Sequence, residues 1–353
     1  MSNKTKIIIS LIVIIAVVGI VSFVGSKNKL AKNNDLTVGA VLALSGPGAV
    51  WGEAFKNGAE MALEDKTGIK ITYEDSKGTP ADGVSAFERL QMQKPDITVS
   101  ILSSVNAALS KTAKDRKVPL LASMTTADGI ANDYVVRYFN NATMYAEPAF
   151  TNPISPVLNV KKIAYIYRND ELGVSTFNKV KELAAKNGKE IVFSDVFKPN
   201  ESDYLTILSK VKASGAQVLM FTDASPVEGV GILKKAQQLN IKIPIVEASG
   251  VFGDPSIRTQ VAGITFYSTC FDFVSPDNSK EFKAKYLAKY GKEPSYGSAF
   301  GYDSINLIYK CKDQKSDILK CLGGTQEITG VSGVANQVAP NDFVVKMHLE
   351  KVN

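Results

Sequence analysis

The chain has 353 residues, of which 45% are hydrophobic and 22% are charged, and its formal net charge is +6. This length suits two globular domains, and the composition is that of an ordinary folded protein. Residues 1–34 hold five lysines and no acidic residue, so the 36 basic residues of the remainder nearly balance its 35 acidic ones, and nucleic-acid binding has no electrostatic basis.

The first feature along the chain is the apolar run 7–24, IIISLIVIIAVVGIVSFV, which follows Lys4 and Lys6. It is long enough for a membrane-spanning helix and longer than the apolar part of most signal peptides. No cysteine lies nearby for lipid attachment, and Val24-Gly25-Ser26 is the best available cleavage site. We predict that residues 1–34 are an anchor and tether, in preference to a cleaved signal segment. The rest of the chain is then extracytoplasmic, in the periplasm or at the cell surface.

The segment Leu36–Gly52 combines a strand, a glycine turn and the start of a helix. The strand is continuously apolar, as buried parallel strands are. It ends at Ser45–Gly48, where two glycines permit backbone angles that other residues resist. From Trp51 onward, apolar residues recur at helical spacing. A buried strand, a tight turn and a helix N-terminus together predict a ligand-binding corner.

Two series of alternating strands and helices follow, separated by a break after Pro153 and Pro156. After the first strand, further strands are predicted at Ile69–Glu74, Ile97–Leu102, Val118–Ala122, Tyr134–Phe139, Ile163–Tyr167, Ile191–Phe197, Val218–Phe221, Ile243–Val246, Ile264–Ser268 and Asp342–His348. This order predicts the α/β class, with two doubly wound, Rossmann-like lobes.

In such sheets, ligands bind beyond the carboxyl ends of the strands. The predicted strand ends are rich in hydroxyl groups, which can bind a carboxylate together with the amides of a helix N-terminus. Ser103-Ser104 and Thr125-Thr126 follow neighbouring strands. Each serine alone also fits a helix N-cap, but the recurrence favours a binding site.

Several segments resemble one known family, the branched-chain (Leu/Ile/Val) amino-acid binding proteins, which are type I periplasmic binding proteins of ABC transporters. The similar segments are LTVGAVLALSGPGAVWGEAFKNGAEMALED, ITYEDSKGTPADGVSAFERL, ILSSVNAALSKTAKDRKVPLLASMTT, IAYIYRNDELGVSTFNKVKELAAKNG and EFKAKYLAKYGKEPSYGSAFGYDSINLIY. The resemblance covers roughly residues 36–350. It implies a Venus-flytrap molecule whose two lobes close on a ligand.

The resemblance also implies how the chain is divided. The first lobe is expected at 35–142 and again at 273–332, and the second lobe at 143–272 and at the C-terminal strand, 333–353. Three hinge crossings are expected near Asn140–Tyr145, Phe271–Ser275 and Gly330–Val334.

Site residues follow from the same resemblance. Ser103 and the segment Met124–Thr126 fall where the family holds a ligand carboxylate, and Trp51 falls where an aromatic flanks the ligand. The second lobe departs from the pattern: Leu172 replaces an aromatic, and Ser249 replaces the acid that accepts an ammonium group. Glu247 or Asp223 could supply that charge instead, although Asp223 also fits a turn or helix cap. The predicted ligand-binding residues are Trp51, Ser103, Ser104, Met124, Thr126, Leu172, Asp223 and Ser249.

The expected function is capture of a small polar ligand, an amino acid or a related amide or carboxylate, and its delivery to the permease of an ABC transporter. No catalysis, cofactor or metal is expected. One alternative is the ligand-binding ectodomain of a sensor. A remote alternative is a dinucleotide-dependent oxidoreductase, because Gly46-x-Gly48-x-x-x-Gly52 with Glu74 or Asp75 imitates a nicotinamide fingerprint imperfectly. His348 is the chain's single histidine, so it is the one candidate for a histidine-based catalytic triad, and its place in a predicted strand makes it a poor one.

The three cysteines lack metal-site spacing. Cys311 and Cys321 lie ten residues apart and could form a disulfide outside the cytoplasm, or remain free. Cys270 is expected to be unpaired and buried.

Overall fold

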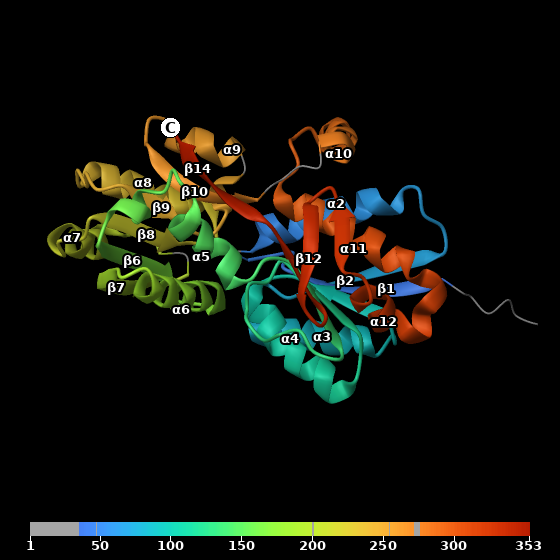
Figure 1. The fold of residues 1–353 in the computed structure, drawn as a ribbon. Helices are drawn as coiled ribbons and strands as arrows, with labels where there is room; N and C mark the ends of the chain where they lie inside the picture. Colours follow the sequence, from blue (N-terminus) through green and yellow to red (C-terminus); the bar gives the residue numbers. More distant parts are fainter. Residues whose placement is uncertain (1–34, 47, 200, 254, 272–275) are drawn as a thin grey trace, which may run out of the picture. The chain divides into compact units, whose positions relative to one another are not determined.

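The computed structural model describes residues 35–46, 48–199, 201–253, 255–271 and 276–353. The predicted anchor at residues 7–24 therefore lies outside the described residues. Within the described ranges, no helix combines the length and the apolar character needed to cross a membrane. Residues 36–353 form one unit built around two β-sheets (Figure 1).

The first sheet has eight strands in the order β11-β12-β13-β5-β4-β3-β1-β2. These are β1 (Leu36–Leu42), β2 (Ile69–Asp75), β3 (Ile97–Ser100), β4 (Leu120–Ser123), β5 (Val135–Tyr138), β11 (Glu327–Gly330), β12 (Gly333–Ala339) and β13 (Asp342–Val345). Strand β1 pairs in parallel with both β2 and β3, so the strand order reverses at β1. Such a reversal opens a crevice beyond the strand ends. We call this sheet and its helices the first lobe.

The helices of the first lobe are α2 (Ala49–Leu63), α3 (Pro80–Gln91), α4 (Ser103–Arg116), α10 (Pro276–Tyr290), α11 (Tyr296–Lys310) and α12 (Ile318–Gly323). Helix α2 buries Trp51, Phe55 and Ala59, which share one face at helical spacing. It packs tightly on α11, because a Cβ atom at Gly58 would lie only 1.8 Å from the Ser298 carbonyl oxygen. This packing fixes the start of α11 beside the start of α2.

The second sheet has six strands in the order β14-β10-β9-β8-β6-β7. These are β6 (Lys162–Arg168), β7 (Glu190–Phe197), β8 (Val218–Thr222), β9 (Ile245–Glu247), β10 (Phe266–Phe271) and β14 (Met347–Val352). Strand β6 pairs in parallel with both β7 and β8, so a second reversal lies at β6. We call this sheet and its helices the second lobe.

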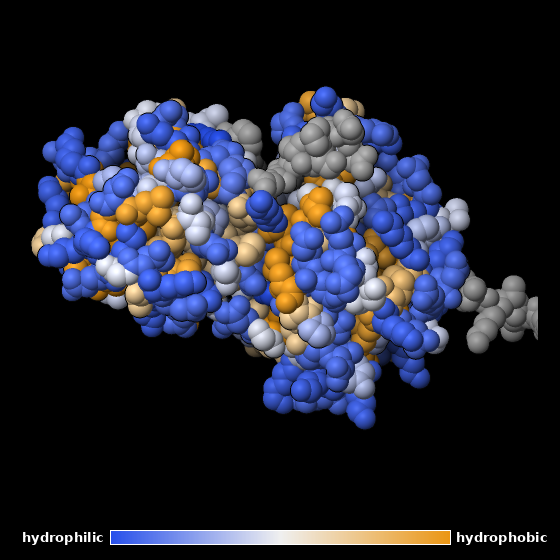
Figure 2. Space-filling model, viewed as in Figure 1, coloured by the Kyte–Doolittle hydropathy of each residue, from blue (hydrophilic) through white to orange (hydrophobic). Residues whose placement is uncertain are grey.

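The second lobe carries α5 (Ala142–Thr151), α6 (Glu171–Lys186), α7 (Leu205–Ala213), α8 (Pro226–Gln238) and α9 (Pro255–Arg258). Short 3-10 helices span Pro156–Asn159, Val251–Gly253, Thr259–Val261 and, in the first lobe, Lys312–Asp317. Apolar side chains fill the space between sheets and helices, and the face shown in Figure 2 is mostly hydrophilic with small apolar groups between. The predicted class, α/β with two doubly wound sheets, is confirmed.

The C-terminal segment differs from the prediction. We expected 333–353 to belong to the second lobe, but β12 and β13 pair within the first sheet and only β14 pairs within the second. The predicted strand Asp342–His348 is therefore two strands, divided at Lys346. The remaining lobe boundaries stay predictions.

The predicted crossing at Gly330–Val334 is wrong for the same reason. Gly330 pairs with Gly333 in the hairpin between β11 and β12, inside the first lobe. The crossing lies instead at Lys346, between β13 and β14. The chain also crosses between β5 and α5, at Asn140, whose Oδ1 accepts a hydrogen bond of 2.8 Å from the Val345 amide. Of the predicted crossing Phe271–Ser275, residues 272–275 lie outside the described residues.

Cys311 and Cys321 form a disulfide, which is one of the two states that the sequence left open, and Cys270 is a free, buried thiol, as expected. Burial raises the pKa of Cys270 to about 12, so the thiol stays protonated. His348 pairs with Glu350 across a distance of 2.8 Å, which agrees with a structural role for this histidine.

Candidate functional site

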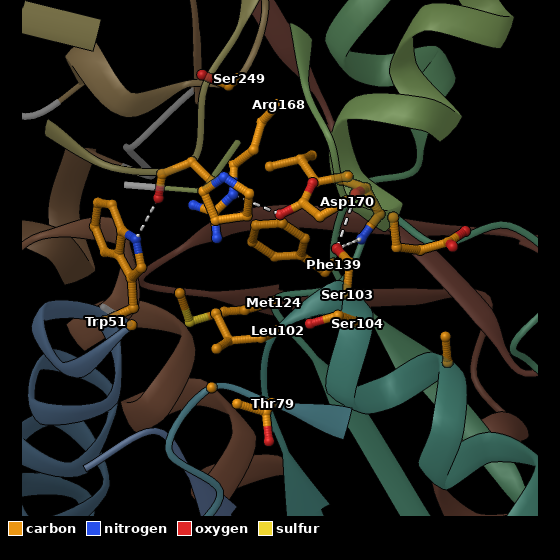
Figure 3. Close-up of a pocket in the computed structure, with 18 of the residues that line it drawn as sticks. Trp51, Thr79, Leu102, Ser103, Ser104, Met124, Phe139, Arg168, Asp170 and Ser249 are labelled. Carbon is orange, nitrogen blue, oxygen red and sulfur yellow. Dashed lines mark hydrogen bonds and ion pairs between the residues drawn. The ribbon is translucent and has the colours of Figure 1, made fainter. Parts of the chain in front are cut away.

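The two reversals in strand order meet at one cavity. The ends of β1 and β3 in the first lobe and of β6 and β8 in the second contribute to its lining, and its volume is about 590 Å³. Figure 3 shows Trp51, Ser103 and Met124 on one side, with Arg168 and Ser249 opposite. This is the position that a doubly wound fold reserves for a ligand.

The glycine turn after β1 forms one edge of the cavity. Gly46 has a φ of +75°, and a Cβ atom there would lie 2.8 Å from the Lys77 carbonyl oxygen, so only glycine fits without strain. The Asp75 carboxylate accepts hydrogen bonds from the Leu44 amide at 2.9 Å and from the Ser45 hydroxyl at 2.5 Å. The Asp75 carboxylate therefore stabilises the turn. In the dinucleotide-binding alternative, the same carboxylate would have to accept hydrogen bonds from a ribose.

Trp51 lies just beyond this turn, at the start of α2. Its ring stacks at a tilt on Tyr296, with 4.7 Å between ring centroids. Its indole Nε1 donates a hydrogen bond of 3.0 Å to the carbonyl oxygen of Ala224, which follows β8 in the second lobe. Trp51 therefore lines the cavity and contacts both lobes.

The hydroxyl groups predicted to hold a carboxylate lie together. The Thr126 amide donates to Ser103 Oγ at 3.0 Å, and Ser103 Oγ is also 3.0 Å from Thr126 Oγ1. Leu102 and Met124 precede them with positive φ angles of 76° and 46°, and the Leu102 amide donates to the Met124 carbonyl at 3.2 Å. These two positive φ angles are sparsely populated for non-glycine residues, and the hydrogen bond between the two segments helps to hold them.

This corner, Ser103 with Thr126, has unused donor capacity. The two hydroxyls carry two protons, and their mutual hydrogen bond uses one of them. Ser103 is also the first residue of the fourteen-residue helix α4, whose N-terminal amides attract anions. The corner can therefore donate hydrogen bonds to a carboxylate that enters the cavity.

Aromatic side chains form much of the remaining wall: Trp51, Phe139, Tyr145 and Tyr296. Phe139 lies 6.3 Å from Tyr145 and 6.3 Å from Tyr296 between ring centroids. These four rings come from α2, the end of β5, α5 and α11. They suit an apolar or aromatic ligand body.

Arg168 projects from the end of β6 into the cavity (Figure 3). Its Nε forms an ion pair of 2.7 Å with Asp170, and its Nη1 lies 3.3 Å from Glu228, a fully buried residue of α8. Asp170 also caps α6 by accepting the Gly173 amide at 3.0 Å. The Glu228 carboxylate in turn accepts the Ala224 amide at 3.0 Å, so this group of charges holds the loop that Trp51 contacts.

Behind the second-lobe wall lies a buried acidic pair. The Ser249 hydroxyl contacts both Asp223 and Glu247, and both carboxyl groups are inaccessible to solvent. Burial, reinforced by the charge of Glu247, raises the pKa of Asp223 well above its usual range, and burial raises the pKa of Glu247. Glu247 also accepts hydrogen bonds from the Ser268 hydroxyl and the Val251 amide, whereas Asp223 Oδ2 has no hydrogen-bond partner, so the raised pKa favours an additional proton on Asp223.

Seven of the eight predicted site residues line the cavity: Trp51, Ser103, Ser104, Met124, Thr126, Leu172 and Ser249. Asp223 is not among the lining residues. Its carboxylate turns toward α8, where Oδ2 would lie 2.2 Å from a Cβ atom at Gly229. The suggestion that Asp223 supplies a negative charge to the ligand is therefore not supported by its position.

Other lining residues were not predicted individually. Arg168 and Asp170 belong to a strand end, and Phe139 follows β5 directly, so the strand-end rule could have identified all three. Tyr145 and Tyr296 do not follow a predicted strand, so the strand-end rule does not identify them. They line the cavity because of the way α5 and α11 pack. Among the described residues, no group of histidine, cysteine, aspartate and glutamate is arranged to hold a metal ion.

Comparison with known proteins agrees with this geometry. The chain is 24% identical to Leu/Ile/Val-binding protein homolog 3 of Brucella melitensis over 198 residues, which is 53% of this chain and 54% of that protein. The chain therefore matches about half the length of that curated relative.

Solved structures share the fold over most of the chain. A branched-chain amino acid transporter substrate binding protein of Streptococcus pneumoniae, in complex with isoleucine, superposes with a TM-score of 0.77 at 23% identity, covering 90% of this chain and 99% of that one. A solute binding protein of an ABC transporter from R. palustris, in complex with benzoate, gives a TM-score of 0.79 at 17% identity, covering 90% of this chain and 93% of that one.

The family itself is shown by a model described as periplasmic binding protein, which matches residues 35–327. This is a family of binding proteins, and membership supports an extracytoplasmic location. The resemblance to branched-chain amino-acid binding proteins and the predicted fold are thereby confirmed. The chain belongs to the periplasmic binding protein family, with the type I fold.

Proposed function

We propose that this protein captures a small carboxylate with an apolar body in the cavity between its lobes and delivers it to the permease of an ABC importer. The observation that carries the proposal is the corner of Ser103 and Thr126, at the N-terminus of α4, facing a cavity with aromatic walls. The volume of about 590 Å³ lies within the range of small-molecule sites.

The ligands of similar proteins support a small carboxylate with an apolar body as the ligand class. Isoleucine and benzoate, bound in the two solved structures, share a carboxylate and an apolar body and differ in the ammonium group. In this chain, Ser103 and Thr126 would bind the carboxylate, with Met124 and Ser104 beside them. Trp51 and the other rings would cover the apolar body, and Leu172 and Ser249 would meet it from the second lobe.

Capture requires no chemical step. The ligand docks on the first lobe, and the second lobe closes over it by a hinge motion at the crossings. Closure removes water from the corner, which strengthens hydrogen bonds to the carboxylate. The closed form is then the form that the permease recognises.

We also propose that residues 7–24 anchor the protein to the cytoplasmic membrane. The support is the eighteen-residue apolar run after two lysines. Full-length protein should fractionate with membranes, whereas a variant that begins near Asn34 should not, and both should bind ligand equally. A mature N-terminus near Ser26 or Lys27, recovered from native cells, would contradict the anchor and leave the extracytoplasmic location intact.

A thermal-shift screen tests the binding proposal. The full-length protein is screened against amino acids, their amides, and small carboxylates with aliphatic or aromatic bodies. A ligand that binds only the native state raises the melting temperature. We expect carboxylates to raise it and the matching amides to have little effect, and an absence of any carboxylate among the stabilising compounds would contradict the proposal.

A further inference from the structure

The Arg168 guanidinium has one unused end. Its Nε lies 2.7 Å from Asp170 as an ion pair without hydrogen-bond geometry, and its Nη1 donates to Glu228, while Nη2 donates no hydrogen bond in the part of the chain that the structure describes. The side chain is 16% exposed and lines the cavity, and its guanidinium group projects into the ligand space (Figure 3). A ligand atom that reaches the second-lobe wall can therefore accept a hydrogen bond from Arg168.

The charge of Arg168 is already compensated. Two carboxylates, Asp170 and Glu228, face one guanidinium, at 2.7 Å and 3.3 Å. A second ligand carboxylate placed at Nη2 would lie close to both existing carboxylates and would be repelled by them. A neutral oxygen accepts the same hydrogen bond without this repulsion.

Lys77 does not change this balance. It lines the cavity on the first-lobe side, and its Nζ pairs with Asp82 at 3.3 Å.

Among the described residues, the cavity-lining Glu171 has no ion-pair partner. It accepts only the Ser175 hydroxyl, at 3.0 Å, whereas Asp170 is occupied by Arg168 and the Gly173 amide. Asp223 and Glu247 turn toward Ser249, behind the wall. The charge of Glu171 adds to the repulsion that a second ligand carboxylate would meet at this wall.

We infer that Arg168 determines ligand selection in this protein: the cavity favours a monocarboxylate with a neutral oxygen, such as a keto or hydroxyl group, at its far end. It disfavours a second carboxylate. This inference rests on the proposed function, in which the first lobe holds the ligand carboxylate.

Matched ligands test the inference by calorimetric titration of the full-length protein. The aliphatic series is 4-methylpentanoate, 4-oxopentanoate and succinate, and the aromatic series is 4-isopropylbenzoate, 4-acetylbenzoate and terephthalate. Within each series the shape is nearly constant while the far end is apolar, neutral oxygen or carboxylate. One of the two series should match the distance between Ser103 and Arg168. In that series, we expect the keto member to bind about tenfold tighter than the apolar member and the dicarboxylate to bind weakest.

Two variants test the role of Arg168. Asp170→Asn removes one compensating charge but keeps an amide oxygen that can cap α6, so the dicarboxylate should gain about tenfold relative to the keto member. Arg168→Gln combined with Glu228→Gln removes both partners of the buried pair and should abolish the preference for the keto member while carboxylate binding persists. Arg89→Gln is the matched control, because Arg89 pairs with Glu74 on the first-lobe surface, at 2.8 Å.

The outcomes are separable. If carboxylates bind but the keto and apolar members bind equally, or if Asp170→Asn leaves the dicarboxylate ratio unchanged, the inference is wrong and the proposed function stands. If no carboxylate binds the wild-type protein, the proposed function fails and the inference fails with it. The wild-type and Asp170→Asn results are enough to confirm or contradict the inference, even if the double variant does not fold.

Discussion

Trp51 of the first lobe donates an indole hydrogen bond of 3.0 Å to the carbonyl oxygen of Ala224 in the second lobe. The same ring stacks on Tyr296 and lines the ligand cavity. Trp51 is the chain's single tryptophan. Its environment therefore depends both on the ligand and on the contact between the lobes.

Tryptophan emission should report ligand binding. A ligand that enters the cavity changes the hydration of the indole, so emission should shift in wavelength or intensity on titration. Trp51→Phe removes the hydrogen bond and keeps a ring, and it should weaken binding about 2- to 10-fold. Trp51→Ala also removes the wall and should weaken binding more.

Melting temperature without ligand provides the control for both Trp51 variants. Because Trp51 is also buried against Tyr296, Trp51→Ala should lower this temperature, and the affinity decides whether the ring contacts the ligand. If Trp51→Ala leaves the affinity intact, Trp51 is a core residue only, and its predicted role at the cavity is wrong.

The buried acidic pair predicts an unusual pH dependence. A carboxyl group whose pKa is raised on folding contributes stability below its unfolded pKa, and this contribution is lost as pH rises through the folded pKa. Asp223→Asn removes one such group and supplies an amide that can donate to Ser249. The free energy of unfolding of this variant, relative to wild type, should therefore increase from pH 5 to pH 8, by at most about 1.4 kcal/mol per pH unit.

Urea unfolding at several pH values measures this difference. Asp115→Asn, which removes an exposed carboxylate paired with Lys111 on α4, is the matched control and should parallel wild type. Parallel curves for Asp223→Asn and wild type would show that Asp223 does not hold the additional proton.

The disulfide should stabilise the first lobe. Cys311 and Cys321 are separated by 10 residues, and loop-closure entropy for so short a loop predicts about 2–3 kcal/mol. A variant with both Cys311→Ala and Cys321→Ala should unfold at lower urea than oxidised wild type. Reductant should lower the stability of wild type and leave the variant unchanged, and two freely alkylated thiols in unreduced protein would refute the bond.

The fold could be predicted because each part of it leaves a periodic signal. Continuous apolar strands such as Leu36–Leu42 alternate with helices whose apolar residues recur every three or four positions, as from Trp51 in α2. The periodic signal did not predict the C-terminal strands correctly. Asp342–Val345 and Met347–Val352 form one extended stretch interrupted only at Lys346, and no local pattern reveals that its halves belong to different sheets.

The site could be predicted only in part, for a similar reason. The strand-end rule located Ser103 and Thr126, because the carboxyl end of a parallel strand is a position in the sequence. It could not show that Asp223 turns away from the cavity while its neighbour Ala224 lines it, since that depends on the packing of α8. The role of Arg168 likewise depends on Glu228, sixty positions along the chain, which only the folded structure brings within reach.

The most direct test of the central claim compares a carboxylate with its amide. Wild-type protein and Ser103→Ala are titrated calorimetrically with the strongest carboxylate from the thermal-shift screen and with the corresponding amide, with Ser85→Ala on α3 as the matched serine control. We predict that wild type and Ser85→Ala bind the carboxylate at least about tenfold tighter than the amide, and that Ser103→Ala loses most of this preference. Equal binding of carboxylate and amide by wild type, or an undiminished preference in Ser103→Ala, would contradict a carboxylate site at Ser103 and Thr126.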